Sequence, residues 1–133
     1  MTEEPDDLRT ITMTDRPPVQ IRECEWPEIA SAIDDDCSET DYGKRRQALA
    51  QGSADRYYLR VRQHADGRRI VYGVLDAAAA AWRREAGGHD IRAGEVLEPG
   101  DDIVAALHRV GMACEFPERV IAEAIAALPA ERL

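Results

Sequence analysis

The chain has 133 residues, with 17 Lys and Arg against 26 Asp and Glu, for a net charge of −9. This length suits a single domain. The negative charge argues against a general binder of nucleic acid or of an anionic membrane, because such proteins carry surplus cations. No apolar run reaches the roughly 18 residues that a membrane span needs, so we expect a cytoplasmic protein. Three cysteines without a CxxC pair predict reduced thiols, and neither a metal site nor another cofactor is expected.

The acidic residues gather toward the N-terminal end. Residues 1–41 hold three basic and thirteen acidic side chains, whereas residues 42–76 hold eight basic and three acidic ones. Residues 1–17 combine acids with prolines and show no periodicity. This pattern predicts an acidic, flexible arm over residues 1–17, followed by a single α+β domain over residues 18–133.

The first elements after this arm are short. Val19–Cys24 alternates apolar and polar residues, which is typical of a strand. Glu28–Ile33 is apolar but too short for periodicity to distinguish a strand from a helical turn. Ser38 or Thr40 can then cap a helix predicted over residues 41–51.

Tyr57–Leu75 carries the clearest structural signal. Two runs of β-branched and aromatic residues flank Asp66-Gly67, a dipeptide that favours the two positive φ values of a type I′ turn. We therefore predict a β-hairpin with Asp66 and Gly67 as its two central turn residues. In that register the apolar face carries Leu59, Val61, Ile70, Tyr72 and Val74. The opposite, solvent-exposed face carries Tyr58, Arg60, Arg62, His64 and Arg69.

The rest of the chain predicts one more strand and two or three helices. Residues 77–86 fit either a helix or a continuation of the second hairpin strand. Ile91–Leu97 predicts a third strand, in which Gly94 is placed to form a bulge. Amphipathic helices follow over residues 102–114 and 117–128, and the apolar hairpin face is the surface they need. The predicted fold is α+β, a small antiparallel sheet built on a central β-hairpin with helices packed on one face.

Three pieces of the sequence share a resemblance. They are Trp26–Ala32 (WPEIASA), Val61–Arg68 (VRQHADGR) with Val71–Val74 (VYGV), and Ile125–Glu131. Together they resemble a family of small uncharacterised bacterial proteins over most of the chain after residue 18. The resemblance implies a bacterial or mobile-element context, and it brings no activity, ligand or catalytic residue with it.

Two charged surfaces are candidates for binding. The first is an acidic run made of Asp34, Asp35, Asp36, Glu39 and Asp41. This run lacks the alternating order and the later Glu of a calcium loop, so we interpret it as a surface for a basic protein partner. The alternative is that the hairpin face binds single-stranded nucleic acid, because arginines hold phosphates and an aromatic ring stacks on a base. That face comprises Tyr58, Arg60, Arg62, His64 and Arg69.

Motifs for catalysis are missing from the sequence. It contains no Gly-rich phosphate loop, GxSxG or HExxH, and its histidines are not spaced with cysteines or acids as metal ligands. We therefore expect a non-enzymatic module that binds a protein partner through its acidic surface. The concrete hypothesis is a phage or mobile-element inhibitor of a bacterial nucleic-acid-binding defence complex.

Overall fold

A computed structural model describes residues 7–35, 56–76 and 91–130. The predicted helix over residues 41–51 and the segment 77–86 lie outside the described residues. In chain order the described elements are β1 (Leu8–Ile11), β2 (Val19–Arg22), β3 (Glu28–Asp35), β4 (Arg56–Gln63), β5 (Arg69–Asp76), β6 (Ile91–Leu97), α3 (Ile103–Ala113) and α4 (Glu118–Ala127).

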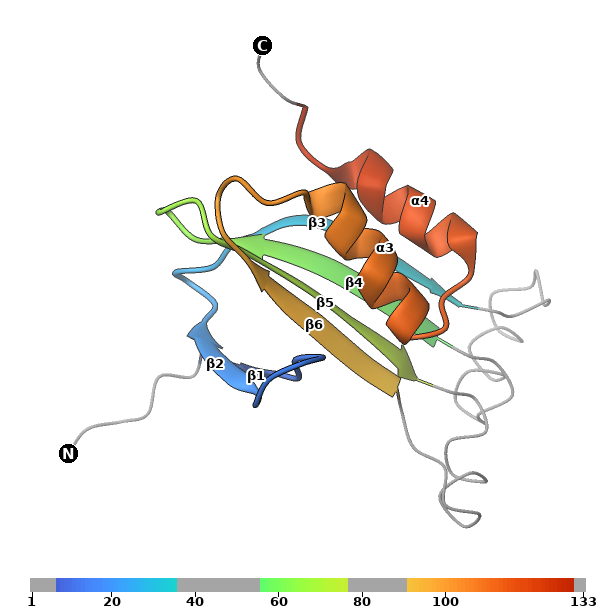
Figure 1. Ribbon diagram of the computed structural model, residues 1–133, viewed down its shortest axis with the longest axis horizontal. Helices are drawn as coiled ribbons and strands as arrows, with labels where there is room; N and C mark the ends of the chain where they lie inside the picture. The colour runs from blue at the N-terminus through green and yellow to red at the C-terminus, as the bar shows by residue number, and fades with distance from the viewer. Residues whose placement is uncertain (1–6, 36–55, 77–90, 131–133) are drawn as a thin grey trace.

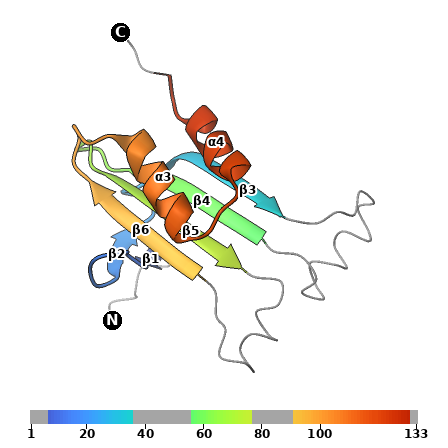
Figure 2. The same cartoon turned by 45° about the vertical axis from the view of Figure 1, so that its right-hand side comes forward.

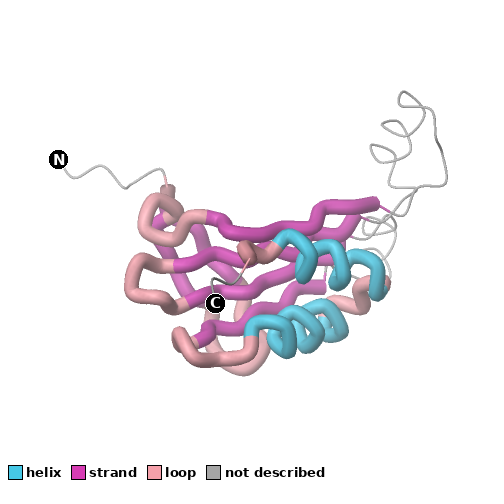
Figure 3. Tube along the Cα trace, turned by 90° about the horizontal axis from the view of Figure 1, so that it is seen from above, coloured by secondary structure: helices cyan, strands magenta, loops and turns pink. Residues whose placement is uncertain are grey.

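A four-stranded antiparallel sheet with strand order β3-β4-β5-β6 forms the centre of the molecule. The two helices lie next to each other over one face of this sheet, and the β1–β2 hairpin lies on the other side (Figures 1 and 2). Seen from above, both helices are on the same side of the strands (Figure 3). The predicted α+β fold is therefore confirmed, and the undecided Glu28–Ile33 segment is a strand.

The β4–β5 hairpin is present, but its predicted register is wrong by one residue. Gly67 has a φ of +95°, whereas Asp66 has no positive φ and so cannot take part in a type I′ turn. The His64 N–H donates to the Arg68 carbonyl at 2.8 Å, which closes a three-residue loop. This extra loop residue reverses the faces of β5 relative to β4, because side chains alternate with a period of two. Val61 therefore pairs with Val71 and not with Tyr72.

The helix-covered face contains the larger core. Seventeen buried residues from β3 to β6, α3, α4 and the turn between the helices form one cluster, and those nearest the centre are fully buried. The β4 and β5 residues in this cluster are Tyr57, Leu59, Val61, Val71 and Leu75. Ile70, Tyr72 and Val74, which were expected beneath the helices, instead occupy the opposite face because of the changed register.

The two helices are joined by a compact turn. The Asp102 side chain caps α3 by accepting a hydrogen bond from the Ala105 N–H at 3.1 Å. At the other end Glu115 has a φ of +59°, and the Phe116 N–H donates to the Gly111 carbonyl at 2.9 Å. These features form a Schellman motif, which turns the chain directly into α4 on the same face of the sheet.

The β1–β2 hairpin corrects the prediction of an acidic arm over residues 1–17. Leu8–Ile11 is strand β1 and pairs antiparallel with β2, while residues 1–6 lie outside the described part. Ile11 and Met13 are buried in a second cluster with Ile21, Trp26, Ile70 and Tyr72. Gly94 is not a bulge, since it pairs regularly with Tyr72. A Cβ at Gly94 would lie only 2.6 Å from the Thr12 carbonyl oxygen, so glycine here permits the close approach of this layer.

Candidate functional site

The β1–β2 hairpin covers only part of the second sheet face. Alternation along the strands places two residues of β3, two of β4, one of β5 and one of β6 on the remaining part of this face. We call this part the open face, and it comprises Ser31, Ile33, Tyr58, Arg60, Val74 and Arg92. It brings together apolar, aromatic and cationic side chains from all four strands of the central sheet.

Ile33 is the most exposed apolar residue of the sheet, with 54% of its surface accessible. Tyr58 is its partner across the β3–β4 pair, and the Arg60 guanidinium lies 5.9 Å from the centroid of the Tyr58 ring. The Arg60 Nε lies 3.7 Å from a carboxylate oxygen of Glu28 and makes no hydrogen bond. Tyr58 and Arg60 are half-buried beside the exposed Ile33. Aromatic, arginine and aliphatic side chains grouped at one surface are the combination that anchors many protein interfaces.

The nucleic-acid face expected from the sequence is divided by the structure. Arg62 is only 7% exposed, and it donates to the Tyr72 hydroxyl at 2.9 Å through Nε and to the Trp26 carbonyl at 3.1 Å through Nη1. Arg69 lies on the helix-covered face, where it donates to the Asp101 carbonyl at 2.8 Å. Of the predicted set, Tyr58 and Arg60 alone belong to the open face.

His64 lies at the hairpin turn and not on a strand face. Its ring centroid is 5.0 Å from that of Trp26, and its Nδ1 accepts a hydrogen bond from the Asp66 N–H at 3.1 Å. The Arg68 guanidinium lies 5.3 Å from the centroid of the same indole. These contacts indicate a structural role for His64, because its ring packs the turn against Trp26.

The acidic run is described only at its beginning. The Asp34 side chain faces α4, where its carboxylate lies 3.4 Å from the Arg119 Nε. Asp35 continues β3 in the backbone, while its side chain and the residues Asp36, Glu39 and Asp41 lie outside the described part. The proposed role of this run in binding a partner stays a prediction.

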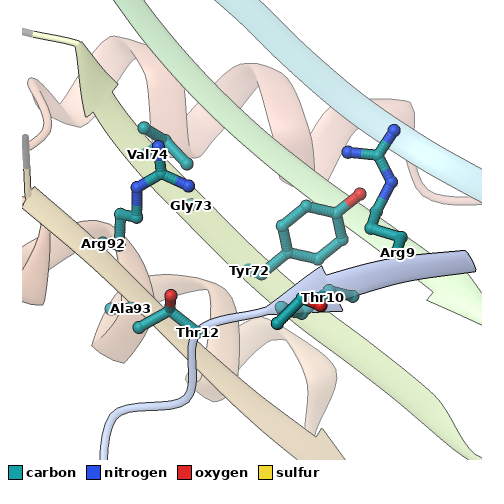
Figure 4. Close-up of a pocket in the computed structure, with 9 residues that line it drawn as sticks. Arg9, Thr10, Thr12, Tyr72, Gly73, Val74, Arg92 and Ala93 are labelled. Carbon is teal, nitrogen blue, oxygen red and sulfur yellow. The ribbon is translucent and has the colours of Figure 1, made fainter. Parts of the chain in front are cut away.

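A small cavity lies where β1 crosses the central strands. Its volume is about 60 Å³, and Figure 4 shows Tyr72 between Arg9 and Arg92, with Thr10 and Thr12 beside it. The Arg9 Nε donates to a Glu23 carboxylate oxygen at 2.6 Å. Sites for small molecules usually enclose roughly 300 Å³ or more. This cavity is therefore too small to be a pocket for an organic substrate.

The two described cysteines are poorly suited to nucleophilic chemistry. The Asp7 carboxylate accepts a hydrogen bond from the Cys24 thiol and raises the pKa of Cys24, which disfavours its thiolate. Burial raises the pKa of the Cys114 thiol from 9.0 to about 12. Within residues 7–35, 56–76 and 91–130 there is also no group of three or more His, Cys, Asp or Glu side chains that could hold a metal.

Sequence reasoning missed four members of the open face, which are Ser31, Ile33, Val74 and Arg92. The alternation within Ile91–Leu97 shows that Arg92 and Ala93 lie on opposite faces, but it does not show which face the helices cover. That assignment depends on the β5–β6 register, in which Val74 pairs with Arg92. The sequence therefore predicts the strand Ile91–Leu97, but it does not predict which of its two faces the helices cover.

No protein-family model, curated protein or solved structure matches the chain. The resemblance to a family of small bacterial proteins stays a prediction. Neither described helix is long and apolar enough to cross a membrane.

Proposed function

We propose that this chain is a non-enzymatic module that binds a protein partner through the open face. The observation that carries the proposal is Ile33, which exposes 54% of its surface beside Tyr58 and Arg60. Leaving an aliphatic side chain in water forgoes about 1.5–3 kcal/mol of burial energy, and a partner that covers it recovers part of this. Tyrosine and arginine beside it supply anchors of the kind that dominate binding energy.

The proposed partner is a basic protein. The net charge of −9 and the acids that end β3 favour association with a positively charged surface and speed the encounter. In its finer form, the proposal is that this partner is a bacterial nucleic-acid-binding defence complex and that the chain inhibits it. The small size, the acidity and the lack of catalytic motifs in the sequence support that form.

Affinity purification from bacterial lysate, with nuclease present, tests the proposal. We expect the tagged wild-type chain to retain a defined protein complex and the double variant Tyr58→Ala/Arg60→Ala to lose it. Met112→Ala is the matched control, because Met112 is 73% exposed on α3, which covers the opposite sheet face. Equal capture by the wild type and the double variant would place the interface elsewhere.

A second candidate function is the binding of single-stranded nucleic acid at the same face. The observation in its favour is the Arg60 guanidinium beside the Tyr58 ring, with the exposed Arg92 on β6 of the same face. A labelled single-stranded oligonucleotide should then bind with an affinity that falls steeply with salt and is lost in Arg60→Ala/Arg92→Ala. If everything captured from the lysate disappears with nuclease, this second function replaces the first.

A further inference from the structure

The hydrogen-bond pattern of the sheet determines which backbone groups of β3 point outward. The His64 N–H donates to the Arg68 carbonyl on the β5 side, and the Gln63 N–H donates to the Pro27 carbonyl at 3.1 Å on the β3 side. Because successive residues in an antiparallel strand bond to opposite sides, Val61 and Leu59 direct their backbone groups toward β3. Their pairing partners Ala30 and Ala32 therefore bond to β4. Ser31 and Ile33 direct their N–H and C=O groups away from the sheet.

The two edge strands of the sheet differ in how their outward backbone groups are hydrogen-bonded. On the β6 edge, the Gly94 carbonyl accepts from the Thr14 N–H at 2.9 Å, and the Gly94 N–H donates to the Thr14 hydroxyl at 3.2 Å. On the β3 edge, no described residue bonds to the outward groups of Ser31 or Ile33. An eight-residue edge strand whose outward backbone groups bond to no described residue is a template for pairing with another strand.

We propose that a basic partner adds an extended strand to the β3 edge, with its backbone bonded to Ser31 and Ile33. This inference rests on the proposed function and specifies how the partner binds. An added strand would place alternate side chains on the same side of the sheet as the open face, beside Ser31 and Ile33. Main-chain bonding would supply affinity, and the open face would select apolar side chains at those alternate positions.

Charge complementarity indicates what kind of strand would pair with the β3 edge. β3 contains Glu28, Asp34 and Asp35 and no basic residue. Because Glu28 and Asp34 also face Arg60 and Arg119, the net charge of −9 over the whole chain adds to the attraction for a cationic strand. A second copy of the chain is a poor fit, because antiparallel pairing centred on Ser31 would set Glu28 of each copy opposite Asp34 of the other. Like charges directly opposite each other are destabilising in a sheet. The occupant we infer is therefore a strand that alternates cationic and apolar residues.

The test uses a fluorescent ten-residue peptide of alternating lysine and valine, with binding followed by fluorescence anisotropy. We expect saturable binding to the wild-type chain and none for a peptide with glutamate in place of lysine. Methylating the backbone nitrogens on one edge of the lysine peptide keeps its charge and removes its donors. It should weaken binding by about tenfold, and methylation on the other edge should have little effect. No binding, or equal loss from methylation on either edge, would overturn the inference.

Two substitutions at one position separate the backbone contribution from that of the side chain. Ile33→Ala keeps the outward N–H and should weaken the lysine–valine peptide only a few-fold. Ile33→Pro removes that N–H, which β4 does not use, so the sheet should tolerate it while peptide affinity falls by about tenfold or more. A thermal melt of each variant checks that the fold is intact. The methylated peptides test the same backbone hydrogen bonds without changing the protein.

The outcomes distinguish this inference from the proposed function. If Tyr58→Ala/Arg60→Ala loses the captured complex while Ile33→Pro and Ile33→Ala bind the peptide equally, the partner uses the open face but adds no strand. That result overturns strand addition alone. Should the double variant keep the complex, the proposed function itself fails.

Discussion

The two faces of the central sheet differ in what covers them. Beneath α3 and α4 lies a cluster of seventeen buried residues, and every one has an apolar side chain, a thiol or an aromatic ring. The opposite face has a cluster of six beneath the small β1–β2 hairpin, next to the buried guanidinium of Arg62. In this comparison the helix-covered face supplies most of the buried core, and the β1–β2 hairpin covers only part of the other face.

The largest expected effect comes from making the same change in each core. Ile121→Ala on α4 should lower the free energy of unfolding by about 4 kcal/mol, because Ile121 is nearly fully buried and the gap would be sealed. Ile70 is only 1% exposed, but it lines a groove of about 360 Å³, so the space left by Ile70→Ala can open to water and the substitution should cost about 2–3 kcal/mol. Urea denaturation of both variants measures the difference. Equal losses would mean that the two clusters stabilise the fold equally.

Arginines on the two faces provide a second matched pair. Arg62→Lys should cost about 2 kcal/mol, because a lysine cannot replace the fork that joins the Tyr72 hydroxyl to the Trp26 carbonyl. Arg69→Lys should cost less than about 1 kcal/mol, because Arg69 makes one hydrogen bond, to the Asp101 carbonyl, and its Nε makes none. Thermal unfolding of the two variants at one pH provides the measurement. A greater loss in Arg69→Lys would show that the two hydrogen bonds of Arg62 do not stabilise the contact between Trp26 and the sheet.

The elements with strong local signals could be predicted from the sequence. The helix stripes and the Asp66-Gly67 hairpin are encoded in neighbouring residues, and the α+β fold follows from them. The register could not be predicted, because Asp-Gly suits both a two-residue turn and the three-residue loop with positive φ at Gly67 alone. That single residue moved Ile70 and Tyr72 to the other face and separated Arg69 from Arg60.

Long-range contacts account for the other differences. β1 has only four residues among acids and prolines, and only its pairing with β2 and its contact with Gly94 make it part of the fold. The residues of β4 alone do not predict that Arg62 is buried, because its partners are a hydroxyl from β5 and a carbonyl before β3. Only Tyr58 and Arg60 of the candidate site were therefore predicted from the sequence.

The cysteine thiols on the two sides of the sheet should respond differently to pH. Cys114 lies in the helix-side core, where its pKa of about 12 exceeds the ordinary value of 9.0. The unfolded thiol loses its proton first, so stability should be unaffected below pH 9 and should fall as the pH rises from 9 toward 12. Cys114→Ala should remove this part of the pH dependence in thermal melts. A pH profile identical to the wild type would show that Cys114 is not the group responsible.

Cys24 should behave differently because it is exposed beside Asp7. The raised pKa of its thiol should slow its alkylation by iodoacetamide at pH 8, and Asp7→Asn should speed it. Peptide mapping by mass spectrometry separates Cys24 from the other two cysteines. Cys114 should stay unmodified until the chain unfolds. An unchanged rate in Asp7→Asn would remove the carboxylate as the cause.

The smallest effects should come from the surface ion pairs on the two sides. On the helix side, Glu95 accepts from Arg109 at 2.8 and 2.9 Å, and this contact raises the pKa of Arg109. On the other side, Glu23 accepts from Arg9 at 2.6 Å. Both pairs are open to water, where screening and side-chain entropy offset most of the attraction. Glu95→Gln and Glu23→Gln should each shift the thermal midpoint by at most about 2 °C. A much larger loss in Glu23→Gln would mean that charge, and not the six-residue cluster, attaches β1–β2 to the sheet; high salt should then reproduce that loss in the wild type.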